Sequence, residues 1–452
     1  MSTPPPPDAR TAPALGLSLC LLAGCGDRSD GTDADASASA SAGASETDAS
    51  ETDASATEGE GSTGPGDAPG PCDKLGVCAD DPASAPLFSE PIQVVPAANM
   101  PDEVDSNYAH NNLDAQWHDG RLYFAFRTAN THFAGEETEM YVVSTEDLKT
   151  WSFEKKVALG TDVREPQFLS LPDRLIFYYA ALGSDPFNFE PMGTRYSIQA
   201  GPGDWSADQE IFDAEFIPWR IKDYDGTIYL TGYTGGGAIY NPGGDPIEVK
   251  LLTTTDGVQW GAALPGQETV LTGGSSETDF VFTDDGGIVA VSRNEAGDEL
   301  GFGMKICKAA PGDLGNWQCV ADPKKYDSPL LFNHKGVIYL LGRRNVTETG
   351  WYDLMEDGLT HEEQYGKYQI DYSTKPKRCS LWRVDPGTLA VTLVEDLPSH
   401  GDTCFPELVK LNDDQYLVFN YTSPLDKQDE DYSWIEGQSR PTIIYRLVMT
   451  PP

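Results

Sequence analysis

The 452-residue sequence is poor in positive charge, and this shortage limits the partners that the protein can have. It contains 31 Lys and Arg residues against 72 Asp and Glu residues, which gives a formal net charge of −41 at pH 7. Binding of nucleic acid needs Lys and Arg side chains that neutralise phosphates, so the composition argues against such a partner. A strongly acidic chain is instead suited to staying soluble outside the cytoplasm.

The sequence also lacks the spacings of cysteine and histidine that are typical of metal sites. Neither a CxxC nor an HxxxH motif occurs, which argues against zinc, and we expect no cofactor. The many carboxylates leave one metal hypothesis open, because clustered Asp and Glu oxygens bind Ca²⁺ even where no EF-hand-like loop is present.

The apolar run near the N-terminus, residues 14–24, is too short to cross a bilayer as a helix and ends in small side chains. We therefore interpret residues 1–24 as a signal peptide. The ending Leu22-Ala23-Gly24-Cys25 resembles the lipobox of bacterial lipoproteins, which implies lipidation of Cys25. It also implies anchorage in the bacterial cell envelope, at the outer membrane or the cell surface, through the lipid alone. A plain secretory signal is the alternative.

Residues 25–70 have a composition that cannot support a packed core. They consist almost wholly of Asp, Glu, Ser, Thr, Ala, Gly and Pro, with a tandem ETDASETDAS from Glu46 to Ser55. Such a segment cannot bury enough apolar surface to offset its chain entropy, so we expect a disordered tether. Residues 71–90 then form a lead-in that contains two cysteines.

Six cysteines remain after Cys20, in the predicted signal peptide, and Cys25 are set aside. An even number in an exported chain indicates disulfides. Pairing of neighbours joins Cys72 with Cys78, Cys307 with Cys319, and Cys379 with Cys404, although the sequence leaves about 15 connectivities open.

Six similar segments recur along the rest of the chain, each a tight turn followed by an apolar strand. They are HDGRLYFAFR (118–127), LPDRLIFYYA (171–180), YDGTIYLTGY (224–233), DDGGIVAVSR (284–293), HKGVIYLLGR (334–343) and NDDQYLVFNY (412–421). A period near fifty residues leaves room for four strands, which is typical of a propeller blade. The sequence predicts an all-β fold, a monomeric six-bladed propeller over residues 91–452, with an insertion at about 345–378. We expect the ring to close by pairing residues 91–95 with 442–449, because an open ring leaves bare sheet edges.

Equivalent positions of the six repeats should converge at one end of the central channel. Seven residues after the turn the repeats have Arg127, Ala180, Tyr233, Arg293, Arg343 and Tyr421. Nine residues before it they have Asn111, Arg164, Ile217, Glu277, Asp327 and Phe405. If both registers meet at one mouth, arginines and carboxylates gather there, while strand-end charges paired between blades are the structural alternative.

A second signature, an aspartate four residues before a tryptophan, occurs in TEDLKTW (145–151), TTDGVQW (254–260) and PGDLGNW (311–317). We expect these aspartates to cap tight turns while the tryptophans pack between sheets. The segments resemble the Asp-box of sialidase-type propellers, also named bacterial neuraminidase repeats. That resemblance implies that Glu277, Arg293 and Arg343 occupy catalytic or substrate-binding positions of the family. Two positions depart from it: His110 and Asn111 replace the first arginine, and Phe405 replaces the nucleophilic tyrosine, so cleavage of sialic acid by that pair is not expected.

Hydrolysis of another glycoside stays open, since it needs two carboxyl groups that flank a sugar bond. The candidate catalytic residues are Glu277, Asp327, Glu165 and His132. Arg164-Glu165-Pro166 also resembles the Arg-Asp-Pro element of the five-bladed furanosidase clan. The candidate substrate-binding residues are Arg127, Arg293, Arg343, His110, Arg164, Tyr233 and Tyr421, with the arginines holding an anionic or hydroxyl-rich ligand. The sequence thus predicts a sialidase-like glycoside hydrolase acting on a glycan or polysaccharide, and the alternative is a non-catalytic surface lipoprotein that binds glycan or protein.

Overall fold

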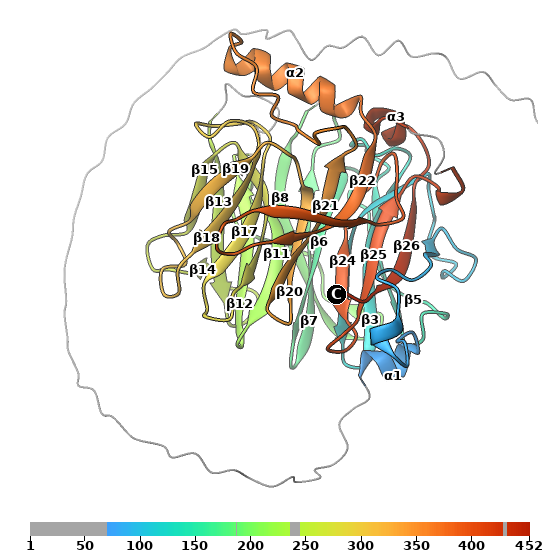
Figure 1. Cartoon of the computed structure of the whole chain (residues 1–452). Coiled ribbons are helices and arrows are strands. Elements are labelled where there is room, and N and C mark those ends of the chain that lie inside the picture. Colours follow the sequence, from blue (N-terminus) through green and yellow to red (C-terminus); the bar gives the residue numbers. More distant parts are fainter. Residues whose placement is uncertain (1–69, 187, 236–244, 428–431) are drawn as a thin grey trace, which may run out of the picture. The chain divides into compact units, whose positions relative to one another are not determined.

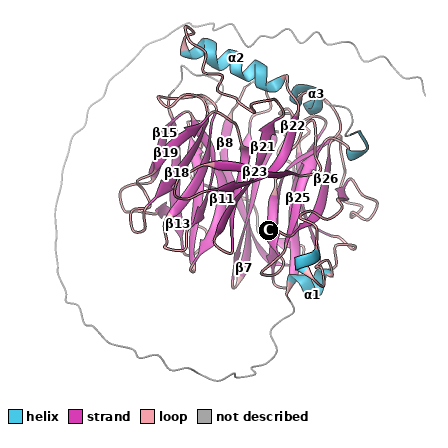
Figure 2. Ribbon diagram, viewed as in Figure 1, coloured by secondary structure: helices cyan, strands magenta, loops and turns pink. Residues whose placement is uncertain are grey.

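The described part of the chain is a ring of six antiparallel sheets (Figures 1 and 2). The computed structural model describes residues 70–186, 188–235, 245–427 and 432–452. The predicted six-bladed propeller is confirmed. Residues 1–69, with the predicted signal peptide, Cys25 and nearly all of the predicted tether, lie outside the described residues. In the described residues, no helix is long and apolar enough to cross a membrane.

Each blade is a meander of short strands whose inner member lies next to the central axis. Blade 1 contains β2 (Ala109–His118), β3 (Arg121–Ala129), β4 (Glu139–Thr145) and β5 (Ser152–Val157). Blade 2 contains β6 (Asp162–Leu171), β7 (Arg174–Leu182), β8 (Pro191–Gly201), β9 (Asp204–Trp205) and β10 (Gln209–Ile211). Blade 3 contains β11 (Ile217–Tyr224), β12 (Thr227–Thr234), β13 (Ile247–Thr254), β14 (Gly261–Ala262) and β15 (Thr269–Gly273).

The other three blades repeat this order. Blade 4 contains β16 (Ser275–Phe282), β17 (Ile288–Asn294), β18 (Met304–Ala309) and β19 (Gln318–Asp322). Blade 5 contains β20 (Asp327–His334), β21 (Val337–Asn345), β22 (Lys377–Val384) and β23 (Val391–Asp396). Blade 6 contains β24 (Glu407–Lys410), β25 (Tyr416–Thr422), β26 (Ile443–Met449) and the N-terminal β1 (Ile92–Val95).

The ring closes by pairing its first strand with its last. Strand β1 runs antiparallel to β26, with Ile92 opposite Arg446 and Val95 opposite Ile444, as predicted. The lead-in to β1 holds the short helix α1 (Pro71–Leu75) and the 3-10 turn η1 (Pro82–Ser84). Ala79 N donates to Gln415 Oε1 at 3.0 Å, so the lead-in is also tied to blade 6.

The inner strands share an irregularity close to their first residues. The register between inner and second strand shifts in blades 1–5, after Asn111, Arg164, Pro218, Ser275 and Asp327. The residues that follow in three blades adopt positive φ: Asn112 at 40°, Glu165 at 51° and Ser328 at 51°. A β-bulge changes the direction of side chains at a strand end, so each blade can aim polar groups toward the axis.

The expected aspartate-capped turns are present in the first two Asp-Trp segments. Asp147 Oδ1 accepts the N–H groups of Lys149 and Thr150 at 2.8 and 2.7 Å, and Asp256 Oδ1 accepts those of Val258 and Gln259 at the same distances. In the third segment, Asp313 accepts from the side chain of Asn316.

The neighbour pairing of cysteines is also observed. Disulfides join Cys72 with Cys78, Cys307 with Cys319, and Cys379 with Cys404. The second links facing residues of β18 and β19, and the third links β22 to the segment that leads into β24. Three disulfides are typical of a protein that folds in an oxidising compartment.

The segment between β21 and β22 carries helix α2 (His361–Ser373), which lies over one end of the propeller beside helix α3 (Trp434–Gln438) (Figure 1). Thr360 accepts the N–H of Glu363 and the Glu363 side chain returns a hydrogen bond, a capping box that begins α2. Tyr365, Tyr368 and Tyr372 form its buried stripe. They pack with other aromatic side chains contributed by three separate segments: Phe302, Tyr352 and Trp434.

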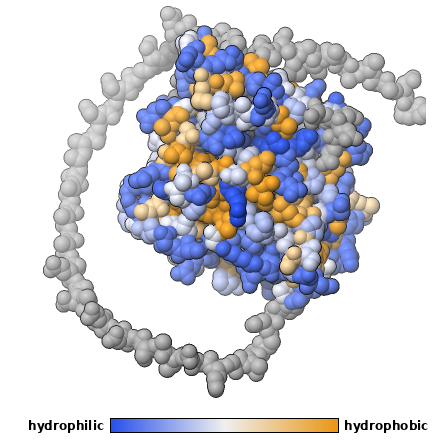
Figure 3. All heavy atoms as spheres, viewed as in Figure 1, coloured by the Kyte–Doolittle hydropathy of each residue, from blue (hydrophilic) through white to orange (hydrophobic). Residues whose placement is uncertain are grey.

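Figure 3 shows hydrophilic side chains over most of the visible face of the propeller, with apolar side chains gathered near its middle. Outside the ring, Leu425–Lys427 forms the 3-10 turn η3. The largest cluster of buried apolar side chains lies inside the ring of blades, and it includes residues of every blade except blade 5. Packing between blades therefore provides much of the core.

Closure of the ring can be tested with two substitutions in the same strand. Val95 of β1 is fully buried, whereas Ile92 is 50% exposed. Val95→Asp should lower the free energy of unfolding by at least about 3 kcal/mol, because it buries a charge without a partner. Ile92→Asp should lower the free energy of unfolding by less than about 1 kcal/mol. Urea unfolding followed by tryptophan fluorescence measures both, and equal losses would contradict a closing role for β1.

Candidate functional site at the channel mouth

The two predicted registers meet at one end of the inner strands, which we name the channel mouth. Asn111 pairs with Arg127, Arg164 with Ala180, Ile217 with Tyr233, and Asp327 with Arg343. Side chains then join the blades at this end. For example, Arg164 Nη2 donates to the carbonyl oxygen of His132 at 2.7 Å, across blades 2 and 1.

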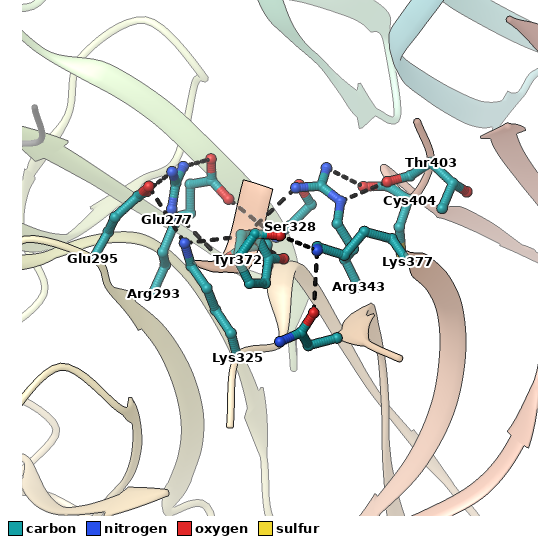
Figure 4. A network of polar contacts seen from close by, with 12 residues as sticks. Glu277, Arg293, Glu295, Lys325, Ser328, Arg343, Tyr372, Lys377, Thr403 and Cys404 are labelled. Carbon is teal, nitrogen blue, oxygen red and sulfur yellow. Dashed lines mark hydrogen bonds and ion pairs between the residues drawn. The ribbon is translucent and has the colours of Figure 1, made fainter. Parts of the chain in front are cut away.

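Glu277 lies at the start of β16 and is held from two neighbouring strands (Figure 4). Its Oε1 accepts from Arg293 Nη1 of β17 at 2.5 Å, and its Oε2 accepts from the N–H of Ser328 at 3.0 Å. Ser328 is one of the bulge residues with positive φ. The bulge of blade 5 thus turns a backbone donor toward the carboxylate of blade 4. Glu277 keeps 13% of its side chain exposed.

Glu165 is the bulge residue of β6, and its backbone conformation places its carboxyl group toward blade 1. Its Oε2 accepts from Asn112 Nδ2 at 3.2 Å, and Asn112 is the bulge residue of β2. Burial raises the pKa of Glu165 to about 8, and the negative charge of Glu277 contributes to this shift. The two glutamates therefore sense each other's charge, and Glu165 holds its proton at neutral pH.

Asp327 proves to be a buried counterion. Its Oδ2 accepts from Tyr372 Oη at 3.0 Å and lies 3.4 Å from Lys325 Nζ and 3.5 Å from Arg343 Nη1. Burial favours the protonated acid, but the charges of Lys325 and Arg293 outweigh it and keep the pKa of Asp327 below its usual value. The hypothesis that Asp327 is an acid-base group or nucleophile does not fit these contacts, because its carboxylate is 1% exposed and held by cations.

Arg343 is anchored between blades 5 and 6. Its Nε donates to the carbonyl oxygen of Thr403 at 2.6 Å and its Nη2 to that of Cys404 at 3.2 Å. Trp434 covers it, with the ring centroid 5.0 Å from the guanidinium carbon. Tyr421 Oη accepts from Arg343 Nη2 at 3.4 Å, so the predicted substrate-binding pair lies together.

His132 and Asp402 form a hydrogen-bonded pair beside Tyr421. Asp402 Oδ2 lies 2.7 Å from His132 Nδ1, and Asp402 Oδ1 accepts from Tyr421 Oη at 3.0 Å. Burial lowers the pKa of His132 despite the nearby carboxylate, so the imidazole is neutral at neutral pH. A proton on Nδ1 then leaves Nε2 with the lone pair of a base.

Arg127 and Arg164 share Asp162. Arg127 Nε lies 2.8 Å from Asp162 Oδ1 and Arg164 Nε lies 2.6 Å from Asp162 Oδ2. Arg127 is fully buried, and its other nitrogens donate to four oxygens: those of Asn111 Oδ1, Thr131 O, Phe133 O and Thr138 Oγ1. The hypothesis that Arg127 holds a ligand does not fit, and the residue instead positions the loop around His132.

His110 and Tyr233 belong to the walls of the propeller. His110 is buried, its backbone N–H donates to Thr442 Oγ1 at 2.7 Å, and burial lowers the pKa of its imidazole to about 4. Tyr233 is buried in the largest apolar cluster. Direct contact of either side chain with a substrate is therefore not supported by its surroundings.

Sequence reasoning missed several residues of the mouth: Asp162, Glu295, Lys325, Tyr372 and Asp402. Lys325 Nζ lies 3.3 Å from Glu295 Oε1, and Glu295 also pairs with Arg293. Three of the missed residues stand two positions from a ring residue in the sequence, at or just beyond the ends of strands β6, β17 and β20. Extending the repeat alignment by two residues would have found Asp162, Glu295 and Lys325.

A second group of ionisable residues follows on the inner strands, beyond the bulges. Arg220 Nη1 lies 2.9 Å from Glu407 Oε2, and Lys222 Nζ lies 2.7 Å from Asp279 Oδ1. Burial, together with the charge of Glu407, raises the pKa of Asp114 well above its usual value. These ion pairs link blade 3 to blades 4 and 6.

Within residues 70–452, the described ones include no group of three or more His, Cys, Asp or Glu side chains arranged to hold a metal ion. The described residues therefore provide no site that supports the Ca²⁺ hypothesis. Two surface cavities of about 610 and 620 Å³ lie away from the mouth. The first is lined by turns of blades 4 and 5, around Asp285 and Gly336, and the second includes Leu271 and Trp317. Neither contains a predicted catalytic or substrate-binding residue.

The fold resembles that of a sialidase propeller. The sialidase of Trypanosoma rangeli in complex with sialic acid is 12% identical and has a TM-score of 0.52, over 81% of this chain and 59% of that chain. The GH93 α-L-arabinofuranosidase of Fusarium graminearum in complex with arabinobiose is 12% identical, with a TM-score of 0.49 over 80% of this chain and 98% of that chain. Zg3597, a family 117 glycoside hydrolase of Zobellia galactanivorans, is 16% identical, with a TM-score of 0.37 over 58% of this chain and 87% of that chain. No protein-family model and no curated protein matches the sequence. At these identities the likeness shows a shared fold.

The titration of Glu165 predicts how stability depends on pH. Its folded pKa of about 8 exceeds the usual 4.5, so between these values the folded protein keeps a proton that the unfolded chain has released. Stability of the wild type therefore falls as pH rises through this window. Glu165→Gln lacks this titration. Its free energy of unfolding should therefore rise relative to that of the wild type by up to several kcal/mol between about pH 5 and about pH 9, at about 1.4 kcal/mol per pKa unit.

Urea unfolding at a series of pH values measures this difference. Glu268→Gln is the matched control, because that side chain is 51% exposed and remote from the axis in blade 3. Its stability curve should run parallel to that of the wild type. A parallel curve for Glu165→Gln as well would contradict a raised pKa at Glu165.

Proposed function

We propose that this protein is an exported, carbohydrate-active propeller that hydrolyses a glycosidic bond at the channel mouth. The observation that carries the proposal is the pair Glu165 and Glu277. The two side chains come from inner strands of blades 2 and 4, interact through their charges and differ in environment.

Glycoside hydrolysis uses two carboxyl groups with distinct roles. One is protonated and donates its proton to the leaving oxygen, and a raised pKa suits Glu165 to this role at neutral pH. The second acts as a nucleophile on the sugar carbon or as a base on water. Glu277 is fixed for this role by Arg293 and the N–H of Ser328, and it retains some exposure. Separation of two carboxyl environments is the general way in which one site obtains an acid and a base.

His132 is a further base in this proposal. Its Nδ1 is held by Asp402, so its orientation is set in the way that acid-base histidines are commonly oriented. Arg164 of blade 2 donates to the backbone carbonyl oxygen of His132, and the imidazole keeps 15% of its surface exposed.

The fold shared with a sialidase agrees with a carbohydrate-active protein, but the residues argue for another sugar. Phe405 occupies the position expected for a tyrosine nucleophile and packs against Trp219, with ring centroids 5.5 Å apart. A phenyl ring has no hydroxyl to attack a sugar carbon. The proposed chemistry therefore passes through the two glutamates.

A non-catalytic glycan- or protein-binding role is the second candidate. It is favoured by the ion pairs that occupy the mouth and by the two cavities that lie elsewhere on the propeller. Propellers host binding and catalysis on the same fold, so turnover decides between the two.

Hydrolysis can be tested on a panel of aryl glycosides and natural polysaccharides. Glu165→Gln and Glu277→Gln should each lower turnover by about 100-fold or more, the usual weight of a positioned acid-base group. Glu268→Gln should keep wild-type turnover. The wild-type rate should also fall as pH rises through about 8, where Glu165 loses its proton. Binding of a glycan without any turnover would contradict the hydrolase and support the binding protein.

We also propose that Cys25 carries a lipid that anchors the protein in the cell envelope. Expressed in a bacterial host, the full chain should appear in the membrane fraction and incorporate labelled palmitate. Cys25→Ser should lose the label and appear in a soluble fraction. Retention of Cys25→Ser in the membrane fraction would contradict the anchor, whereas secretion of the unlabelled wild type would support the plain signal peptide.

A further inference from the structure

We infer that the glycan accepted at the channel mouth is uncharged, and that sugars bearing carboxylate or sulfate groups are excluded. This inference rests on the proposed function and adds the substrate class. It is carried by the partners of the cationic side chains, each of which is engaged by an oxygen atom of the protein itself.

Arg293 lies among three carboxylates (Figure 4). Its Nη1 lies 2.5 Å from Glu277 Oε1, its Nη2 pairs with Glu295, and its Nε lies 3.7 Å from Asp327 Oδ1. A guanidinium binds a ligand carboxylate through two parallel N–H donors. At Arg293 both edges already face protein carboxylates, so an incoming anion meets negative charge.

Arg343 is occupied on every nitrogen. Two of them donate to the carbonyl oxygens of Thr403 and Cys404, and the third faces Asp327 at 3.5 Å. The guanidinium carbon of Arg343 lies over the ring of Trp434. Binding of an anion here would break hydrogen bonds of buried carbonyl groups, which costs roughly 1–3 kcal/mol for each group left without a partner.

Arg164 is the most exposed of these cations, at 18% of its side chain, and it too is committed. Its Nε lies 2.6 Å from Asp162 Oδ2, and its Nη2 donates to the carbonyl oxygen of His132. Asp162 balances Arg127 at the same time. One carboxylate thus contacts two guanidinium groups, and Arg164 also supports the loop that carries His132.

The two lysines near the mouth are enclosed by aromatic rings and oxygens. Lys325 Nζ lies 4.2 and 4.3 Å from the ring centroids of Tyr352 and Tyr372, besides its contacts with Glu295 and Asp327. Lys377 Nζ lies 3.9 Å from the Tyr372 centroid and donates to Asn345 Oδ1 at 3.2 Å. Both lysines are buried, so neither presents its charge to a ligand.

The charges of the mouth balance within the protein. The mouth contains six basic side chains, Arg127, Arg164, Arg293, Lys325, Arg343 and Lys377, and five carboxylates, Asp162, Glu277, Glu295, Asp327 and Asp402. Burial lowers the pKa of Lys377 to about 6, so this lysine is mostly uncharged at neutral pH and the other five cations match the five carboxylates. The undescribed residues 236–244 and 428–431 contain no Lys or Arg in the sequence. The chain as a whole has a formal net charge of −41, and an acidic protein lowers the concentration of anions near its surface.

The side chains that do reach the opening suit hydroxyl groups. Carboxylate oxygens and an imidazole offer the acceptors and donors that sugar hydroxyls need. Glu277 and His132, whose side chains keep some exposure, supply them at the ends of blades 4 and 1. Neutral pyranoses or furanoses therefore match the mouth, whereas a carboxylate would have to displace an internal ion pair.

The inference is tested by binding of matched neutral and charged sugars to the full-length wild-type protein. Isothermal titration calorimetry at low salt compares lactose with sialyllactose, and neutral xylo- or gluco-oligosaccharides with their uronate-bearing counterparts. The neutral member of a pair that binds should bind at least 10-fold more tightly than its charged counterpart. Equal or tighter binding of the charged member would overturn the inference.

A gain-of-function variant tests the cause. Glu295→Gln removes the carboxylate shared by Arg293 and Lys325, so it should raise affinity for the uronate-bearing sugar by 10-fold or more while leaving neutral sugars unchanged. Glu299→Gln, an exposed glutamate four residues along the same loop, should change neither affinity. A folded Glu295→Gln that gains no anion affinity would contradict internal pairing as the cause. The wild-type comparison stays decisive if this variant does not fold.

These outcomes separate the two proposals. Preferred binding of neutral sugars without hydrolysis contradicts the hydrolase and leaves the inference standing. Hydrolysis of charged sugars in preference to neutral ones overturns the inference while the hydrolase stands, whereas preferred binding of charged sugars without hydrolysis overturns both. Absence of binding by every sugar tested would overturn both.

Discussion

Pairing of β1 with β26 is the interaction on which the rest of this structure depends. It joins residues more than 340 positions apart in the sequence and converts an open row of sheets into a ring. Only in a closed ring do the inner strands surround one axis, so that the start of β2 meets the start of β24 as well as that of β6. The contact of His132 in blade 1 with Asp402 before blade 6 lies across this closure. Without it, the channel mouth would lack one of its sides.

The closed ring then imposes an electrostatic constraint. Six strand ends bring charged side chains into a small buried space, and burial of an unpaired charge costs several kcal/mol. The protein meets this constraint by pairing nearly all of the charges internally, through shared carboxylates such as Asp162 and Asp327. Glu165 differs at the mouth because it holds a proton instead of a cationic partner, and burial raises the pKa of Asp114 beyond the bulges as well. Internal pairing of the other charges therefore leaves Glu165 as the protonated acid of the mouth and leaves little positive charge for a ligand.

The sequence allowed the ring and its register to be predicted because a hairpin is a local structure. A tight turn fixes which residues face each other, so counting from the turn placed Asp327 opposite Arg343 and Asn111 opposite Arg127. Counting from a turn does not place the residues that loops bring into contact with these strand ends. Asp402 and Tyr372 stand outside the repeated unit, and nothing in their local sequence indicates that they lie beside His132 or Asp327. The fold was thus predictable from local periodicity, whereas the roles of Arg127 and Asp327 depended on distant contacts.

The insertion between β21 and β22 shows why position in a fold does not determine the role of a residue. Arg343 ends β21 where the repeat alignment expects a ligand-binding arginine. Yet Tyr372 of the insertion donates a hydrogen bond to Asp327, the carboxylate that faces Arg343. The segment before β26 supplies Trp434, whose ring packs against the guanidinium group of Arg343. The capping box of α2 and its stripe of tyrosines hold this arrangement against Phe302 of blade 4. An arginine at a ring position of the repeat can therefore act as a structural cross-link when an insertion between strands supplies its partners.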